Sequence, residues 1–148
     1  MFCRTTNLNS KAKRINCVNN LHEIGTAYRL WAGDNNQFPL LSVADDHSGE
    51  PAHNCSAYVL WQAMSNNLNT PKILVCPADK KSTVATGFGA GFGNSNISYF
   101  LNAAAKTDLQ MVLDGDADLS IDGIPVQSGI LNVWTNNCIG WTKARNHD

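Results

Sequence analysis

Residues 12–39, AKRINCVNNLHEIGTAYRLWAGDNNQFP, are the most informative segment of this 148-residue chain. Their apolar side chains recur every three or four residues, which is the spacing of one stripe on an α-helix with about 3.6 residues per turn. The stripe consists of Ile15, Val18, Leu21, Ile24, Tyr28 and Trp31. Polar and charged side chains occupy the other face, and an Asn-rich segment before Pro39 ends the helix. We therefore expect one amphipathic N-terminal helix whose apolar stripe packs on the rest of the domain.

A second helix and a strand are predicted in the middle of the chain. Residues 56–67 carry a short apolar stripe, and Ser56 is a suitable N-cap. Residues 72–76, KILVC, read as a buried strand that ends at Pro77. The middle third therefore predicts a helix that leads into the sheet.

The last third carries short apolar runs that predict further strands, separated by turn residues. These are residues 96–102, 110–113 and 129–134, with an Asn-rich turn at 135–137 and an antiparallel return at 138–142. Together the elements predict an α+β fold: one long N-terminal helix packed on an antiparallel β-meander, with a short second helix and long loops.

Size and charge limit the classes of function. The length suits one domain with its own core. A net charge of −1 with 16% charged residues gives no field strong enough to attract nucleic acid or an anionic membrane surface. We therefore expect neither partner for the globular domain.

Two stretches resemble a known family. From Lys11 a basic run leads into Ile-Asn-Cys, Asn-Asn-Leu, Ile-Gly, Leu-Trp-Ala, Asp-Asn-Asn and Phe-Pro, and residues 60–79, LWQAMSNNLNTPKILVCPAD, lead from a helix into a Cys-Pro-x-Asp turn. This order is similar to that of type IV pilin-like proteins and type II secretion pseudopilins with a prepilin-type cleavage and methylation segment. The resemblance implies a non-enzymatic structural subunit whose partners are other pilin-like subunits and the secretion machinery. It also implies a place in the cell envelope, periplasmic or extracellular, with the full-length form anchored in the inner membrane.

Both ends depart from that family. Members begin with a leader and about 20 apolar residues, whereas residues 1–10 read as an atypical or truncated start without an apolar run of about 7–15 residues. Residues 11–148 are then a pilin-like globular domain that is incomplete at its C-terminus. His147 stands where the resemblance places a histidine ahead of an Asp-Gly signature, and the chain ends at Asp148.

The five cysteines suggest disulfides rather than a metal. They are Cys3, Cys17, Cys55, Cys76 and Cys138, and their spacing fits no zinc site. In an exported protein they can form up to two disulfides, and Cys17 with Cys76 is the first pair to test. The alternative is that most of them are small buried apolar residues.

An acidic segment suggests calcium. It places Asp114, Asp116, Asp118 and Asp122 at short intervals, as oxygen ligands around a calcium ion are placed. It is not an EF-hand, because Leu119 stands at its sixth position and Pro125 at its twelfth. The resemblance implies calcium in a loop near the end of the sheet, but we favour a solvated turn and assign no metal ligand.

No pattern indicates catalysis. The four histidines, His22, His47, His53 and His147, stand in no catalytic or metal-binding motif. The glycine-rich segment 87–93 fits no nucleotide-binding motif and reads as a flexible loop anchored by its two phenylalanines. We assign no catalytic or cofactor-binding residue and no cofactor, and a hydrolase is disfavoured.

The aromatic residues leave a second class of function open. Trp31 and Trp61 are expected in the core, whereas Trp141 is left open as a surface contact. The main hypothesis is a head domain of a pilin-like filament subunit. The alternative is an extracellular module that binds calcium or carbohydrate through the acidic segment and exposed aromatic rings.

Overall fold

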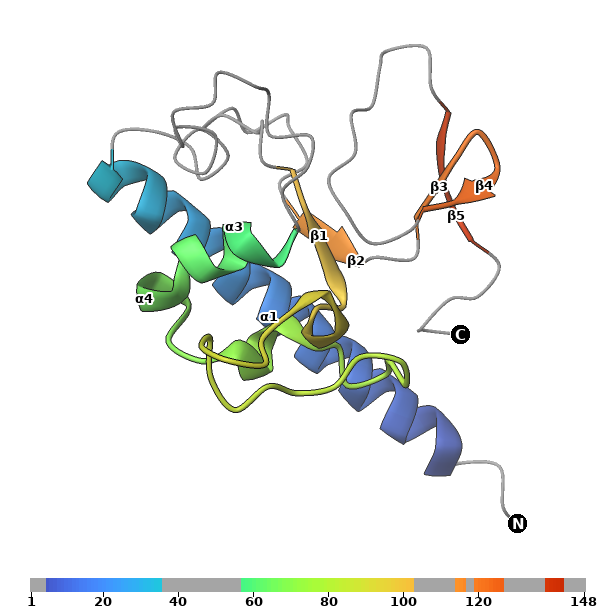
Figure 1. Cartoon of the computed structure of the whole chain (residues 1–148). Coiled ribbons are helices and arrows are strands. Elements are labelled where there is room, and N and C mark those ends of the chain that lie inside the picture. The colour runs from blue at the N-terminus through green and yellow to red at the C-terminus, as the bar shows by residue number, and fades with distance from the viewer. Residues whose placement is uncertain (1–4, 36–56, 103–113, 117–118, 127–137, 143–148) are drawn as a thin grey trace.

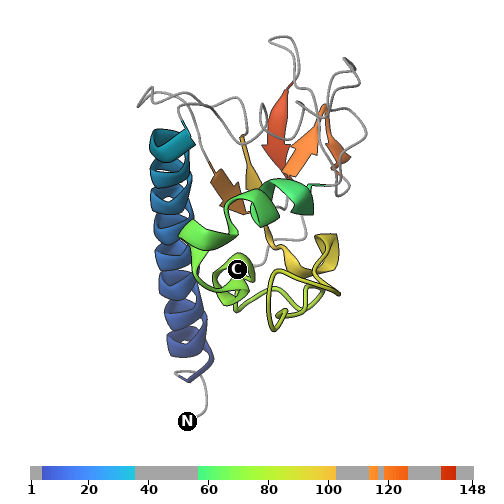
Figure 2. The same cartoon turned by 60° about the vertical axis from the view of Figure 1, so that its left-hand side comes forward.

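A computed structural model describes residues 5–35, 57–102, 114–116, 119–126 and 138–142. One long helix, α1 (Thr5–Asn35), runs along one side of a head that is made of short helices, 3-10 turns and small antiparallel sheets (Figure 1). When the molecule is turned by 60° about the vertical axis, the helix and the head are seen as two layers (Figure 2). The fold is α+β, with a long N-terminal helix, as the sequence predicts.

One face of α1 packs on the head. Cys17, Ile24 and Trp31, which are seven residues apart and so nearly in line on a helix, are 4%, 0% and 7% exposed. Ala27 and Tyr28 are also buried between them. The second half of the predicted stripe is therefore correct.

The first two positions of the predicted stripe are wrong, whereas Leu21 is partly buried and packs against the core. Ile15 and Val18 are 60% and 58% exposed and face solvent. The reason is geometric: each step of three residues falls short of a full turn by about 60°, so three such steps from Ile15 to Ile24 move the stripe to the opposite side of the helix. Cys17 and the half-buried Asn20 occupy the inner face instead.

The second helix is present in two pieces. These are α3 (Tyr58–Ala63) and α4 (Ser65–Leu68), which meet at Met64. Ala57 precedes α3 without a side-chain cap, and the predicted N-cap Ser56 lies outside the described residues. Leu60, Trp61, Met64 and Leu68 are buried, and the indole N–H of Trp31 donates to the carbonyl oxygen of Ala63 at 2.9 Å.

The predicted strand at 72–76 is a 3-10 helix, η1 (Pro71–Leu74). Pro71 sets the first turn, and the Thr70 hydroxyl accepts a hydrogen bond from the backbone N–H of Lys72. The chain becomes extended only at Val75. The burial prediction holds, since Leu74 and Cys76 are fully buried, but the strand prediction is wrong.

The glycine-rich loop is held by its aromatic rings. Phe92 is buried and Phe88 packs against the core, with ring centroids 5.2 Å apart at an interplanar angle of 65°. Tyr58 meets Phe92 edge to face, and Gln62 Nε2 donates to the carbonyl oxygen of Phe88 at 2.7 Å. The prediction that the two phenylalanines anchor this loop is confirmed.

Short strands form two sheets. A 3-10 turn, η2 (Asn94–Asn96), precedes β1 (Tyr99–Leu101), which pairs antiparallel with β2 (Asp114–Asp116). In the other sheet β3 (Leu119–Ile121) lies between β4 (Ile124–Pro125) and β5 (Ile139–Trp141), and all neighbours are antiparallel. The predicted strand at 96–102 is thus shortened at both ends. The predicted strand at 138–142 is present as β5, which pairs with β3, whereas its predicted return along 129–134 lies outside the described residues. The predictions for 110–113, 129–134 and 135–137 lie outside the described residues.

Candidate interaction surfaces

The acidic segment is divided between two elements. Asp114 belongs to β2, and Asp122 occupies the turn between β3 and β4, where its Oδ1 accepts the backbone N–H of Cys138 at 2.7 Å. No group of three or more His, Cys, Asp or Glu side chains gathers as a metal site in the described part of the chain. Asp118 lies outside the described residues, so calcium binding stays a prediction.

Asp114 has a carboxylate oxygen, Oδ2, that is buried and has no hydrogen-bond partner among the described residues. Burial raises the pKa of Asp114 to about 6, against the opposing effect of the positive charge of Arg29. Next to it, a Cβ at Gly115 would lie 2.5 Å from the Phe100 ring, so the β1–β2 pairing requires glycine there.

A two-residue turn, Asp122-Gly123, joins β3 and β4 into a hairpin. It lies within the acidic segment. Asp122 and Gly123 have φ angles of 51° and 79°, as a type I′ turn requires. Asp-Gly between isoleucines is the strongest short-range hairpin signal, and it identifies this turn from sequence. The spacing of the aspartates alone predicts a solvated turn or a calcium loop, whereas the pair Asp122-Gly123 predicts the hairpin.

Cys17 and Cys76 meet at one phenol. Both are buried thiols, and, after burial itself, both contribute to raising the pKa of Tyr99. The Tyr99 hydroxyl also accepts a hydrogen bond from Asn20 Nδ2 at 3.3 Å. Burial raises the pKa of Tyr99 far above its usual range, and the hydrogen bond with Cys17 acts in the same direction. The fold thus brings the predicted pair into one cluster, while the disulfide itself stays a prediction for an oxidising compartment.

Asp79 closes the turn that follows Cys76. Its carboxylate accepts the backbone N–H of Lys81 and the hydroxyls of Ser82 and Ser98, each at 2.7 Å. Burial alone would raise the pKa of Asp79, but these hydrogen bonds together hold it below its ordinary value. The cluster ties the turn to the segment before β1, which supports a structural role.

The remaining predicted residues are dispersed. His22 lies exposed on α1, and Trp31 and Trp61 are in the core as expected. The backbone of Trp141 is in β5, opposite Leu119. His47, His53 and His147 lie outside the described residues.

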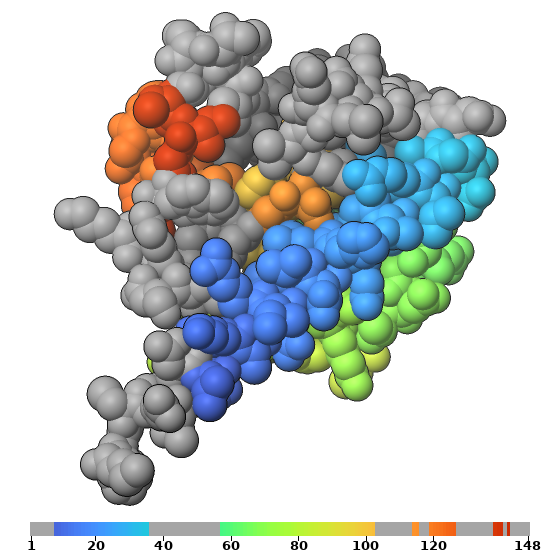
Figure 3. Space-filling view, turned by 180° about the vertical axis from the view of Figure 1, so that it is seen from behind, coloured from blue at the N-terminus to red at the C-terminus, as the bar shows by residue number. Residues whose placement is uncertain are grey.

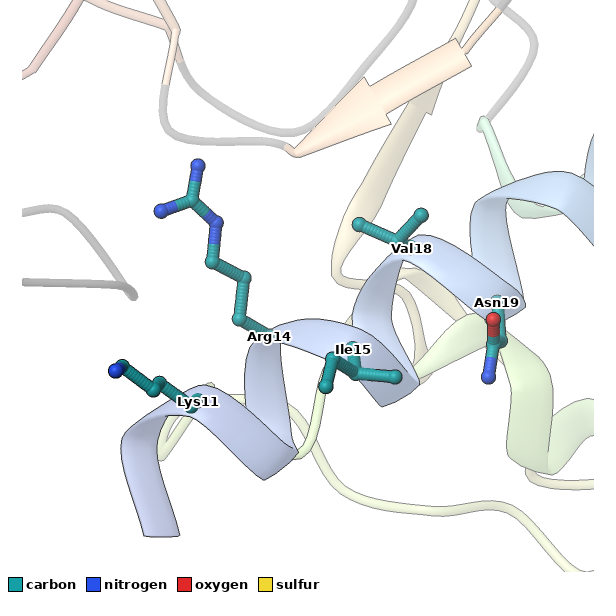
Figure 4. A pocket seen from close by; sticks show the side chains of 5 residues that line it. All are labelled: Lys11, Arg14, Ile15, Val18 and Asn19. Carbon is teal, nitrogen blue, oxygen red and sulfur yellow. The ribbon is translucent and has the colours of Figure 1, made fainter. Parts of the chain in front are cut away.

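The outer face of α1 is the most exposed apolar surface of the helix. We use this name for Leu8, Lys11, Arg14, Ile15, Val18 and Asn19. Leu8, Ile15 and Val18 are 67%, 60% and 58% exposed. A shallow depression runs between the side chains from Lys11 to Asn19, with the two cations beside the aliphatic groups (Figure 4). From behind, this side of α1 is open to solvent along most of its length (Figure 3).

The chain matches no protein-family model, no curated protein and no solved structure. Within the described residues, no helix has the length and apolar character that a membrane crossing requires.

Proposed function

We propose that this chain is the head domain of a structural subunit in a filament of the type II secretion or type IV pilus class, and that it is not an enzyme. The outer face of α1 carries the proposal. A helix that served only to cover the core needs one apolar face, yet α1 has aliphatic groups on both faces. Exposed aliphatic groups in a row on a soluble surface are typical of a contact with another protein.

The arrangement of the helix supports the same function. The N-terminal end of α1 extends past the head (Figures 1 and 2). In a pilin-like subunit this end continues into an apolar segment that joins neighbouring subunits, while the head faces outward. The partners are then other pilin-like subunits and the secretion machinery, in the cell envelope. The resemblance of residues 12–39 and 60–79 to pilin-like proteins agrees with this assignment.

A grafting experiment tests the proposal. The leader and apolar helix of a type II secretion pseudopilin are joined ahead of Lys11, and the chimera is expressed with the matching secretion machinery. We expect leader processing by the prepilin peptidase, and immunogold labelling of the head along filaments sheared from the cells. A chimera that is processed, anchored and folded but stays absent from filaments that the parent pseudopilin enters contradicts the proposal.

Two variants make the same test specific. Ile15→Lys with Val18→Lys alters the outer face of α1 where both side chains are exposed, so the fold should survive. Val84→Lys is the matched control, because Val84 is a β-branched residue with 54% exposure that lines a second depression beside Asn19 and is not one of the aliphatic groups of the outer face. We expect the double variant to be lost from filaments and the control to be retained.

A further inference from the structure

A row of isoleucines crosses the three-stranded sheet. Ile121 of β3 is in register with Ile124 of β4 on one side and with Ile139 of β5 on the other. Residues directly opposite each other in antiparallel strands place their side chains on the same face of the sheet. Ile124 and Ile139 are 71% and 59% exposed. We call these three residues the isoleucine row. It is an apolar surface without a partner among the described residues.

Charged side chains of opposite sign border the outer face of α1 and the isoleucine row. Lys11 and Arg14 line the outer face of α1, and residues 5–22 contain no acidic residue. The exposed Asp122 occupies the turn that leads into Ile124 of the isoleucine row.

The two surfaces lie apart in one copy of the chain. The three-stranded sheet is at the top in Figures 1 and 2, whereas the N-terminal half of α1 is in the lower half of both views. Two different surfaces that complement each other give a heterologous contact, which repeats along an axis when the rotation does not close.

We infer that the outer face of α1 binds the isoleucine row of a second copy of this chain, head to tail. Ile15 and Val18 pack on Ile124 and Ile139, while Lys11 and Arg14 face the acidic turn at Asp122. This inference rests on the proposed function, and it identifies a second copy of the chain as the partner of the outer face of α1. A small interface of this kind is weak in a pair, and repetition along a filament makes it effective.

Complementary variants test the direction of the contact. The helix variant carries Ile15→Lys and Val18→Lys, and the sheet variant carries Ile124→Lys and Ile139→Lys. Both are checked for native circular dichroism, and association is followed by sedimentation velocity up to millimolar concentration at low salt. We expect the unmodified chain and the Val84→Lys control to associate, and each double variant alone to associate about tenfold or more weakly.

The mixture of the two variants is the decisive sample. Each variant retains one intact surface, so an equimolar mixture should form dimers and nothing larger. A mixture that stays monomeric contradicts the inference. So does a double variant that associates like the unmodified chain, or an unmodified chain that is monomeric at millimolar concentration.

Cysteine labelling tests the contact without a variant. Cys138 is an exposed thiol beside Ile139. Its rate of alkylation, measured by peptide mass spectrometry on the unmodified chain, should fall as protein concentration rises and recover in high salt, because salt screens the charged groups. A rate that is independent of concentration contradicts the inference.

The two proposals can fail separately. If the chimera enters filaments but the sheet variant enters equally well, the head-to-tail contact is wrong and the filament function stands. If the mixed variants dimerise in solution but the chimera never enters filaments, the contact stands and the filament function is wrong.

Discussion

The two faces of α1 carry similar side chains in different environments. Ile24 on the inner face is fully buried, whereas Ile15, about two and a half turns away on the opposite side of the helix, is 60% exposed. The difference is the presence of a head on one side only. Apolar residues spaced three or four apart therefore identify a helix but not its packed face. Successive steps of three residues move such a row around the helix, so one row can begin on the exposed face and end on the packed face.

Truncation of one isoleucine on each face tests this comparison most directly. Ile24→Ala removes buried methyl groups and leaves a cavity, so we expect a loss of about 3–4 kcal/mol in the free energy of unfolding. Ile15→Ala should change it by less than about 0.5 kcal/mol. Urea denaturation followed by circular dichroism measures both. Equal losses would show that the outer face is also packed.

A covalent link from the inner face gives the next largest effect. Oxidation of Cys17 and Cys76 in a glutathione buffer joins the inner face of α1 to the segment after η1. We expect non-reducing peptide mapping to find this pair, and the oxidised protein to be about 2–4 kcal/mol more stable to unfolding than the reduced one. Recovery of both thiols by alkylation after denaturation of the oxidised sample would contradict the pairing.

Asp79 stabilises the turn that follows Cys76, and Cys76 belongs to the core on which the inner face of α1 packs. Asp79→Ala leaves the buried Ser98 hydroxyl without its acceptor, so we expect a loss of about 2 kcal/mol in the free energy of unfolding at neutral pH. Since the pKa of Asp79 is lowered in the folded state, its contribution is present above the unfolded pKa of about 3.9 and disappears as pH falls through the folded pKa. Urea titrations at several pH values measure this, with the exposed Asp34→Ala as the matched control. Equal losses for the two variants would remove the special role of Asp79.

Asp114 gives the smallest effect and the opposite sign. Its strand β2 contacts α1, and the pKa of Asp114 is raised to about 6 in the folded state. Ionisation therefore weakens the fold as pH rises from about 4 to about 6. Asp114→Asn should stabilise the protein by about 1 kcal/mol above that range, after allowance for solvent screening, and have no effect near pH 3. Thermal unfolding of both proteins across this range measures the difference. A stability difference that is independent of pH would contradict it.

Much of the fold follows from the sequence. The fold class, the position of α1, the aromatic core residues and the anchored glycine-rich loop were all predictable, because each depends on spacing or on large apolar side chains. The segment at 72–76 was not, since a buried apolar run does not distinguish a strand from a short helix. The local signals that favour the 3-10 helix are Thr70, which caps its first turn, and Pro71, which stands at its start.

The candidate surfaces were less predictable. Exposure of Ile15 depends on which side of α1 the head occupies, and this is a tertiary property. Part of the isoleucine row was predictable, because the Asp122-Gly123 turn fixes the hairpin and thereby the pairing of Ile121 with Ile124. The pairing of Ile121 with Ile139 joins strands far apart in the chain, and no local pattern specifies it.

The buried core has a consequence for the order of events during synthesis. Among the side chains that the structure describes, the buried hydrophobic ones run from Cys17 to Tyr99. A nascent chain can therefore collapse around α1 before its last third leaves the ribosome. The isoleucine row is completed only when β5 emerges, so the surface that we assign to self-association forms last. Unfinished chains therefore lack that surface.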